Sequence, residues 1–331
     1  MMRAGLIGCG RIGCEFDSDA ARIGIYTHAA AYRAAEGVGL HAIADADPAK
    51  LANAAQRYGI APERCFISAE AMLAAGGLDL ISIAAPDRFH ADLALKAIAT
   101  PGVRGILLEK PLALTLDEGR AVLTAAAANK VALAVNYSRR FCPAHAKVRE
   151  AISAGELGDI HTVTGFYGKG IRHNGTHWLD LLRHFFGPIA SVQAWPSRAA
   201  PFEQDPSPDL RIVLASGLVA HLHASNHLDY SLFEMDIVAA QGRVQLLESG
   251  HRVVWHTVGE SPYYAGYRLP LLHHVDELGM RDLLLRAVEN LRDAVLTGQS
   301  PQCSGDDGLA ALLAADAACR SLTTGQPEML T

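Results

Sequence analysis

The sequence lacks several features that mark common classes of protein. Its six cysteines are scattered and form no CxxC pair, so neither a zinc knuckle nor a disulfide framework is indicated, and reduced thiols in a cytosol are expected. No stretch reaches the uninterrupted apolar length of a membrane span, and the first apolar run is too short for a signal peptide. We therefore expect a soluble, untargeted, cytoplasmic protein.

An excess of positive charge is missing too. A net charge of -6 offers no broad basic field, which argues against nucleic acid and anionic membrane as partners. Hydrophobic residues make up 50% of the chain and charged residues 19%, so a sizeable core can form. With 331 residues, the chain is long enough for about two domains. A small molecule is the expected partner.

The first part of the chain alternates short apolar runs with helical stretches. Strands are expected at about 3–8, 79–85, 105–109 and 131–136, and helices at about 69–75, 90–99 and 115–128. This alternation is typical of a parallel sheet that is covered on both faces.

The first apolar run breaks into a glycine turn and is followed further on by a helical stretch. Gly8 and Gly10 would allow a tight turn and the close approach of backbone N–H groups to a diphosphate at a helix N-terminus. Gly13 would let the helix pack closely on the sheet. The whole loop, including Arg11 and Ile12, is predicted to bind a dinucleotide.

A second strand ends in Asp45, which lies 32 residues after Gly13 instead of the usual offset of about 20. The excess matches a polar segment, 14–26, which is either an insertion beside the cofactor that covers the substrate or a surface loop without function. Asp45 would accept hydrogen bonds from ribose hydroxyls and repel a 2′-phosphate, which favours NAD over NADP. The helix cap is already supplied by Asp47.

After Asn136 the pattern changes to longer, alternating runs with hairpin turns at Ser216-Gly217 and Gln241-Gly242. The predicted fold class is α/β: a Rossmann doubly wound parallel sheet, followed by an α+β domain with a large, mainly antiparallel open sheet. We expect a dinucleotide-binding domain over 1–136 and a substrate-binding and oligomerisation domain over 137–331.

Several stretches together resemble the Gfo/Idh/MocA family of sugar and inositol dehydrogenases. They are GLIGCGRIG, IADADPAKL, IAAPDRFHADLALKA, LLEKPLALTLDEG, VNYSRRFCPAHAKVREAI and GDDGLAALLAADAACRSLTTGQP. The resemblance covers nearly the whole chain, and the EKP motif after the fifth strand is its most specific element.

The resemblance implies that Lys110 of the EKP motif reaches toward the nicotinamide and the reacting oxygen of the substrate. An ammonium can polarise the alkoxide or carbonyl that hydride transfer produces. Glu109 orients this lysine or simply ends the strand, and Pro111 is a candidate for a cis peptide bond. The turn with Pro86 and His90 resembles the cofactor side of the family's site.

A second constellation is RHNGTHWLDLLRHFFG, in which Thr176 is expected to cap a helix. The resemblance implies that His177 is the acid/base and that Asp180, one turn later, contacts substrate. The helix dipole would help to keep the imidazole neutral, and Asp180 would oppose that effect. The alternative is a histidine that is hydrogen-bonded to backbone near the cap. We expect His177 and Lys110 to meet over the nicotinamide ring.

The chain departs from the resembled pattern at His173, where many members carry an aspartate four residues before the catalytic histidine. The triad of the inositol dehydrogenases is therefore not reproduced, and His173 and Asn174 become candidates for substrate binding. His173 and His177 are also spaced as metal ligands often are, but Gly175 between them and the lack of a third ligand predict no metal.

Other polar residues have two open interpretations. Arg139 and Arg140 follow a strand and hold the substrate or are merely solvated. Tyr26, His28 and Tyr32 line the pocket or pack in the core.

The sequence thus predicts an NAD(H)-dependent oxidoreductase that acts on a secondary alcohol or ketone of a sugar, aminosugar or nucleotide sugar. The alternatives are an imine or enone reductase on the same scaffold and a non-catalytic NAD-binding regulator. A homodimer or homotetramer through the C-terminal sheet is expected.

Overall fold

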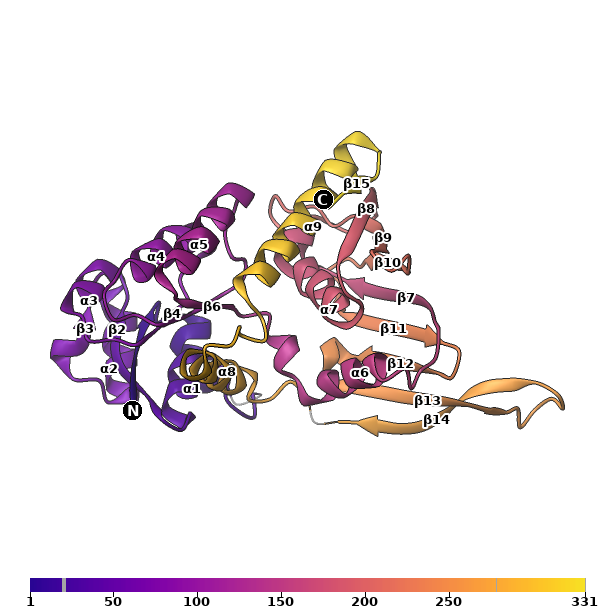
Figure 1. Cartoon of the computed structure of the whole chain (residues 1–331), viewed down its shortest axis with the longest axis horizontal. Helices are drawn as coiled ribbons and strands as arrows, with labels where there is room; N and C mark the ends of the chain where they lie inside the picture. The colour runs from indigo at the N-terminus through magenta and orange to yellow at the C-terminus, as the bar shows by residue number, and fades with distance from the viewer. Residues whose placement is uncertain (20–21, 278, 331) are drawn as a thin grey trace. The chain divides into compact units, whose positions relative to one another are not determined.

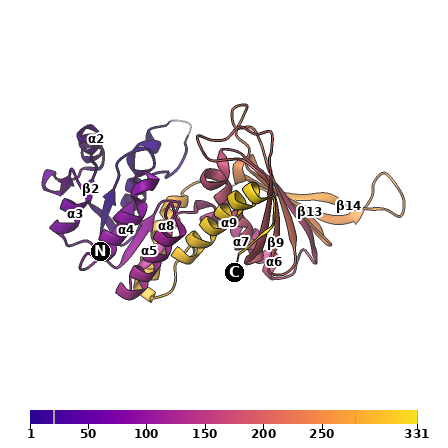
Figure 2. The ribbon, with the colours of Figure 1, turned by 90° about the horizontal axis from the view of Figure 1, so that it is seen from above.

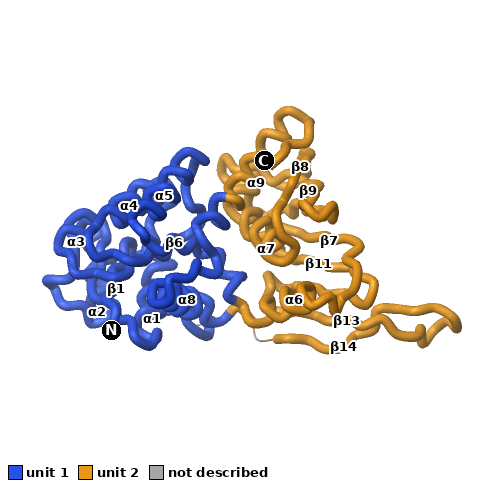
Figure 3. The backbone as a smooth tube through the Cα atoms, in the orientation of Figure 1, with its two compact units in different colours: residues 1–141, 281–309 blue, residues 142–280, 310–331 orange. Residues whose placement is uncertain are grey.

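The computed structural model describes residues 1–19, 22–277 and 279–330. The chain divides into two compact units, one made of residues 1–141 and 281–309 and the other of residues 142–280 and 310–331 (Figure 3). The expected domains were two continuous stretches that met near residue 136. In the structure, residues 281–309 also belong to the first unit. Among the described residues, no helix combines the length and the apolar character that a membrane span requires.

The first unit contains a six-stranded sheet in which every strand is parallel, in the order β3-β2-β1-β4-β5-β6. Its strands are β1 (Met2–Ile7), β2 (Val38–Ala44), β3 (Cys65–Phe66), β4 (Leu80–Ile83), β5 (Gly105–Leu108) and β6 (Ala132–Val135). Strands β4 and β5 are buried along their whole length, because helices cover the sheet on both faces. The predicted doubly wound sheet is confirmed.

The helices of this unit are α1 (His28–Ala34), α2 (Pro48–Tyr58), α3 (Ala69–Ala75), α4 (His90–Ile98), α5 (Leu116–Asn129) and α8 (Leu283–Thr297). Helix α8 packs against α1, β5 and β6, whereas α4 packs against α3 and α5 (Figure 1). Local signals set the helix ends: the carboxylate of Asp47 accepts hydrogen bonds from the first turn of α2, and Thr115 and Glu118 form a capping box on α5.

The second unit contains a nine-stranded sheet, in the order β14-β13-β12-β11-β7-β10-β9-β8-β15. Its strands are β7 (Ile160–Tyr167), β8 (Ile189–Trp195), β9 (Asp209–Leu214), β10 (Val219–Ala224), β11 (Glu234–Ala239), β12 (Gly242–Leu247), β13 (Arg252–Glu260), β14 (Arg268–Asp276) and β15 (Glu328–Met329). Only the described pair β7–β10 is parallel, so the predicted, mainly antiparallel sheet is confirmed.

Three helices accompany this second sheet: α6 (Pro143–Ser153), α7 (Thr176–Phe186) and α9 (Gly305–Thr324), of which α9 belongs to both units. Figure 2 shows them on one face of the sheet. Side chains of β7 alternate accordingly between buried and partly exposed positions.

The tightest packing of α7 on the sheet is at Trp178, which is fully buried and donates its indole N–H to the backbone oxygen of Glu234 over 3.0 Å. A Cβ atom on Gly165 of β7 would overlap the indole and lie 2.5 Å from that oxygen.

Gly165→Ala should therefore lower the free energy of unfolding by about 1–3 kcal/mol, because the ring has no room to move. Chemical denaturation measures the change. Gly39→Ala is the matched control, since its Cβ would meet only the flexible end of Met1 at 3.4 Å. Equal stability of the two variants would contradict the close packing.

Candidate active site

The glycine turn after β1 has two positions that admit no side chain. Gly8 has a φ of +98°, and a Cβ there would lie 2.5 Å from the backbone oxygen of Ala84. A Cβ on Gly13 would overlap the backbone oxygen of Gly8. A Cβ on Gly10 would meet only the Nζ of Lys50, at 4.0 Å. The turn therefore packs tightly underneath and stays open above Gly10, where a phosphate group can approach.

The segment after the turn, which was expected to be an insertion or a surface loop before the first helix, begins with short helical turns. A five-residue π-helical turn (Arg11–Glu15) and a 3-10 turn (Phe16–Ser18) come first, and α1 begins only at His28. The expected helix N-terminus under the diphosphate is thus a single short turn. Residues 20 and 21 of the expected insertion lie outside the described residues.

The inserted segment is tied to the start of α1. The carboxylate of Asp17 accepts a hydrogen bond from the backbone N–H of Tyr26 over 2.7 Å and another from the hydroxyl of Thr27. Thr27 in turn caps α1, through its bond from the N–H of Ala30. The chain therefore resumes the first helix at a defined place after the insertion.

Asp45 lies beside the glycine turn, directly after β2. One oxygen of its carboxylate accepts a hydrogen bond from the backbone N–H of Cys9 over 2.6 Å, and the other accepts one from the N–H of Asp47 over 2.8 Å. Asp47 caps α2 with its own carboxylate. The placement of Asp45 fits the role of a ribose acceptor, because its carboxylate is fixed next to the turn.

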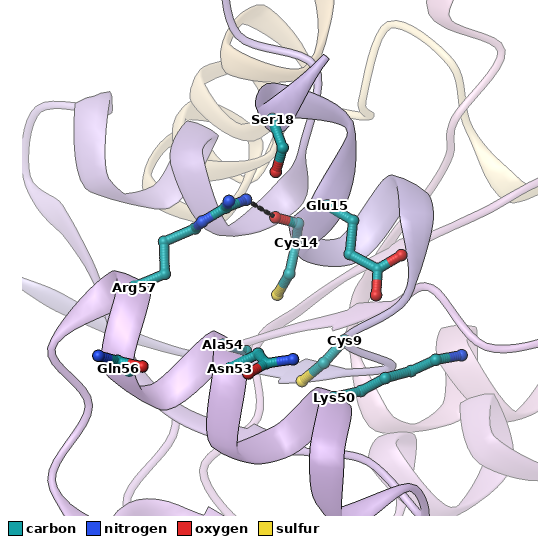
Figure 4. Close-up of a pocket in the computed structure, with 9 residues that line it drawn as sticks. All are labelled: Cys9, Cys14, Glu15, Ser18, Lys50, Asn53, Ala54, Gln56 and Arg57. Carbon is teal, nitrogen blue, oxygen red and sulfur yellow. Dashed lines mark hydrogen bonds between the residues drawn. The ribbon is translucent and has the colours of Figure 1, made fainter.

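Lys50 was missed by the sequence reasoning. With Cys9, Cys14 and Arg57 it lines a cavity of about 540 Å³ beside the glycine turn, in which Arg57 donates a hydrogen bond to the backbone oxygen of Cys14 over 3.0 Å (Figure 4). Its place in the first turn of α2, after Asp47-Pro48, was a usable signal, since that turn starts at the same sheet edge as Gly10.

At the end of β5, Glu109 has a largely buried side chain that is 13% exposed. Its Oε1 accepts hydrogen bonds from His28 Nε2 over 3.0 Å and from Asn136 Nδ2 over 2.5 Å. Burial alone would raise the pKa of Glu109, but these bonds and the Lys110 ammonium outweigh it and hold the pKa below its usual value. Lys110 is partly exposed, and the peptide bond from Lys110 to Pro111 is cis.

His90 begins α4 and is fully buried. Its Nδ1 lies 2.6 Å from the backbone oxygen of Pro111, and its Nε2 lies 2.9 Å from that of Ala85. Pro86 directly precedes the 3-10 turn Asp87–Phe89, which connects Ala85 to His90. The ring of His90 thus links the turn after β4 to the segment after Lys110, and any influence on a cofactor passes through these backbone groups.

In the second unit, the other candidates lie on a π-helical turn, Gly170–Gly175, and on α7, which follows it directly. The turn carries His173, which is exposed, and Asn174; the helix carries His177 in its first turn. Asp180, also on α7, is buried and only 1% exposed.

The expectation that Thr176 caps α7 is wrong. Its hydroxyl donates a hydrogen bond to the backbone oxygen of Arg172 over 3.1 Å and accepts none from the helix. The reason is that the preceding π-helical turn already continues into α7 without a break, so no capping residue is needed.

The sequence did not point to Asp205 either. Its side chain contacts the backbone of the turn Gly170–Gly175. Its carboxylate accepts hydrogen bonds from the backbone N–H groups of Arg172 over 2.9 Å and His173 over 2.8 Å. Burial raises the pKa of Asp205 above its usual value, although these bonds oppose the shift. No local pattern marks this residue, because the contact spans more than thirty positions.

The two arginines after β6 differ. Arg140 is buried and engaged in structure: its guanidinium lies 3.1 Å from the carboxylate of Asp307 and donates to the backbone oxygen of Gln302. Arg139 is partly exposed, so it stays a candidate for substrate binding. Because Lys110 and His177 belong to different units, their expected meeting at one nicotinamide ring stays a prediction.

The chain was compared with known proteins. Residues 2–137 match the model of an oxidoreductase family with an NAD-binding Rossmann fold. An inositol 2-dehydrogenase from Rhizobium meliloti is 28% identical over 97% of both chains. A D-apiose dehydrogenase from Paraburkholderia graminis is 32% identical over 56% of this chain and 52% of its own.

Two solved structures have the same fold. A levoglucosan dehydrogenase in complex with NADH and L-sorbose superposes with a TM-score of 0.82 at 21% identity, covering 100% of this chain and 99% of its own. An oxidoreductase from Agrobacterium radiobacter in complex with NAD+, L-tartaric acid and magnesium gives 0.81 at 21% identity, covering 99% and 98%.

The glycine turn with open space above Gly10 and the carboxylate of Asp45 beside it fit an adenosine diphosphate moiety, as in an NAD-binding Rossmann fold. Together with the family match, they confirm the expected cofactor, NAD. Residues 2–137 are thus similar to the NAD-binding part of this oxidoreductase family.

Asp45→Ser should weaken NADH binding about tenfold and narrow the preference for NADH over NADPH, because a ribose acceptor and a repelling charge are both lost. Fluorescence titration with each cofactor measures this. Asp117→Ser, at an exposed site in the first turn of α5, is the control. A parent protein that already prefers NADPH would contradict the ribose assignment.

Proposed function

We propose that this protein is an NAD-dependent dehydrogenase that oxidises a secondary alcohol of a cyclic polyol or sugar, or reduces the corresponding ketone. The observation that carries the proposal is the placement of Lys110: it lies two residues after the end of a buried parallel strand, next to the largely buried carboxylate of Glu109, in the unit that holds the glycine turn. Ligands of open α/β sheets bind at this carboxyl edge.

Each proposed residue has one chemical task. Bound NAD supplies the hydride acceptor or donor. The ammonium of Lys110 stabilises the negative charge that develops on the substrate oxygen. The imidazole of His177 takes the hydroxyl proton during oxidation and returns it during reduction. Asp180 orients substrate or His177, and His173, Asn174 and Arg139 contact the hydroxyl groups of the substrate.

The names of the relatives support a polyol or sugar as substrate, since they are an inositol 2-dehydrogenase and a D-apiose dehydrogenase. They do not favour the imine or enone reductase or the regulator. The departure at His173 argues that the substrate differs from inositol in at least one hydroxyl contact, because an exposed imidazole stands where an aspartate is common in the family.

A homodimer or homotetramer through the sheet of the second unit is also proposed. Large apolar side chains are exposed on its strands: Phe166 on β7 is 40% exposed, Trp195 on β8 is 44% exposed and Leu272 on the edge strand β14 is 65% exposed. Location in the cytoplasm is proposed from the six free thiols.

Lys110→Ala should lower kcat about a hundredfold, because the developing charge on oxygen loses its partner, while NADH affinity stays within a few-fold. NADH absorbance with a broad panel of cyclic polyols and sugars, including myo-inositol, scyllo-inositol and D-apiose, measures the rate. Lys96→Ala is the control, since Lys96 lies on the surface of α4 and forms an ion pair with Glu70 of α3. NADH binding without turnover of any substrate would contradict the dehydrogenase and favour the regulator.

His177→Ala should lower kcat about a hundredfold or more and leave NADH affinity intact, because only proton exchange with the substrate is lost. The same assay and an NADH titration separate the two effects. His161→Ala, at an exposed position of β7, serves as control. An unaffected rate would remove His177 from the mechanism.

A further inference from the structure

A chain of buried hydrogen bonds runs through the first unit and ends on Glu109. The hydroxyl of Tyr32 lies 2.8 Å from the Oγ of Ser82, which lies 3.0 Å from Nδ1 of His28. The Nε2 of His28 is 3.0 Å from Oε1 of Glu109. Tyr32, Ser82 and His28 are all fully buried. The first three residues come from α1 and β4; for His28 and Tyr32 the sequence left pocket lining and core packing open, and Ser82 was not a candidate.

The chemistry of the acceptor sets the direction of the last bond in this chain. The ionised carboxylate of Glu109 only accepts, so Nε2 of His28 carries a hydrogen and donates it. Nδ1 of the same ring lies within hydrogen-bond distance of Ser82, whose oxygen lies within that distance of the Tyr32 hydroxyl. Because Ser82 and His28 each have a partner on both sides, the chain tolerates burial and holds the carboxylate of Glu109 in one orientation.

His90 makes the corresponding contacts on the other side of Lys110. Its ring nitrogens face the backbone oxygens of Pro111 and Ala85 at 2.6 and 2.9 Å. Both oxygens only accept, so each ring nitrogen that carries a hydrogen donates it to one of them. The segment after Lys110 is thereby tied to the turn after β4.

We propose that His28 and His90 are positioning residues for Lys110. His28 acts through the carboxylate of Glu109, the residue before the lysine, and His90 acts through the carbonyl of Pro111, the residue after it. The two rings approach the same three-residue segment from α1 and α4, and together they determine where the ammonium of Lys110 is held. The consequence for catalysis rests on the proposed function of Lys110, whereas the consequence for its position does not.

A packing role alone would not account for these contacts. An apolar side chain fills a buried site without the cost of desolvating two ring nitrogens. The fully buried His145 of α6 offers a comparison, because its Nε2 meets the backbone oxygen of Gly250, far in sequence from every proposed catalytic residue. It is a matched control for the loss of a buried imidazole.

The first experiment measures the position of Lys110 without any turnover. Wild type, His28→Leu, His90→Leu and the control His145→Leu are treated with a trace of acetic anhydride, and acetylation of Lys110 relative to Lys96 is measured by peptide mass spectrometry. His28→Leu and His90→Leu should each change the relative acetylation of Lys110 several-fold. For His28→Leu the acetylation should rise, because the carboxylate beside the ammonium loses its orientation. Unchanged acetylation in both variants would overturn the proposal.

Conservative variants separate positioning from packing. Gln at position 28 can place an amide N–H near the Nε2 site, and Asn at position 90 can place one near the Nδ1 site. His28→Gln and His90→Asn should therefore restore most of the wild-type labelling. If a Leu variant fails to fold, these two and Ser82→Ala carry the test, and Ser82→Ala should shift labelling in the same direction as His28→Leu.

The second experiment uses kcat in a double-mutant cycle with the best substrate of the panel above. His28→Leu should lower kcat about tenfold in the wild-type background and have little further effect in the Lys110→Ala background, because it acts through that lysine. Equal losses in both backgrounds would overturn the positioning role. No loss from Lys110→Ala itself would instead contradict the proposed function, while the labelling result stands independently.

Discussion

A carboxylate that is removed from water at the end of β5 is the constraint on which the functional edge of the first unit depends. An ionised carboxylate in that place is costly unless several donors surround it. Glu109 obtains them from His28, from Asn136 and from the charge of Lys110. These groups belong to α1, the end of β6 and the end of β5. The three segments must therefore pack in register before the edge can exist, which couples folding of the unit to the placement of its lysine.

The glycine turn is separated from α1, which begins at His28, by the polar segment 14–26. Gly8 and Gly13 are held in contact with backbone on their inner side, so the turn keeps its shape although the helix behind it lasts only five residues. Asp17 then gathers the returning chain, and Thr27 caps α1. His28 consequently stands at the first position of that helix, where its ring reaches Glu109. The hydrogen bonds of Asp17 and Thr27 thus fix the start of the helix that carries His28.

The second unit uses a buried acid in a comparable way. Asp205 gathers the backbone N–H groups of the turn that precedes α7, and Arg172 on that turn forms an ion pair with Asp316 of α9 over 2.7 Å. The exposed His173 and the helix with His177 are presented by this braced turn. In both units, groups without a proposed chemical task hold the backbone that carries the candidate residues, as a rigid site requires.

The sequence by itself determined the features that local pattern encodes. Apolar runs of four residues predict buried parallel strands, Asp47-Pro48 predicts the start of α2, and the glycine spacing with Asp45 predicts the cofactor site, because each signal depends on neighbours in the chain. Tertiary structure alone decided the contacts between distant segments: His28 with Glu109, Lys50 with the space above Gly10, and Asp205 under its turn. Even Thr176, a good cap by local rules, proved otherwise, because the turn before it adopts a helical path that Asp205 holds. Contacts between residues that are dozens of positions apart depend on how whole helices and strands pack, so no periodic pattern along the chain predicts them.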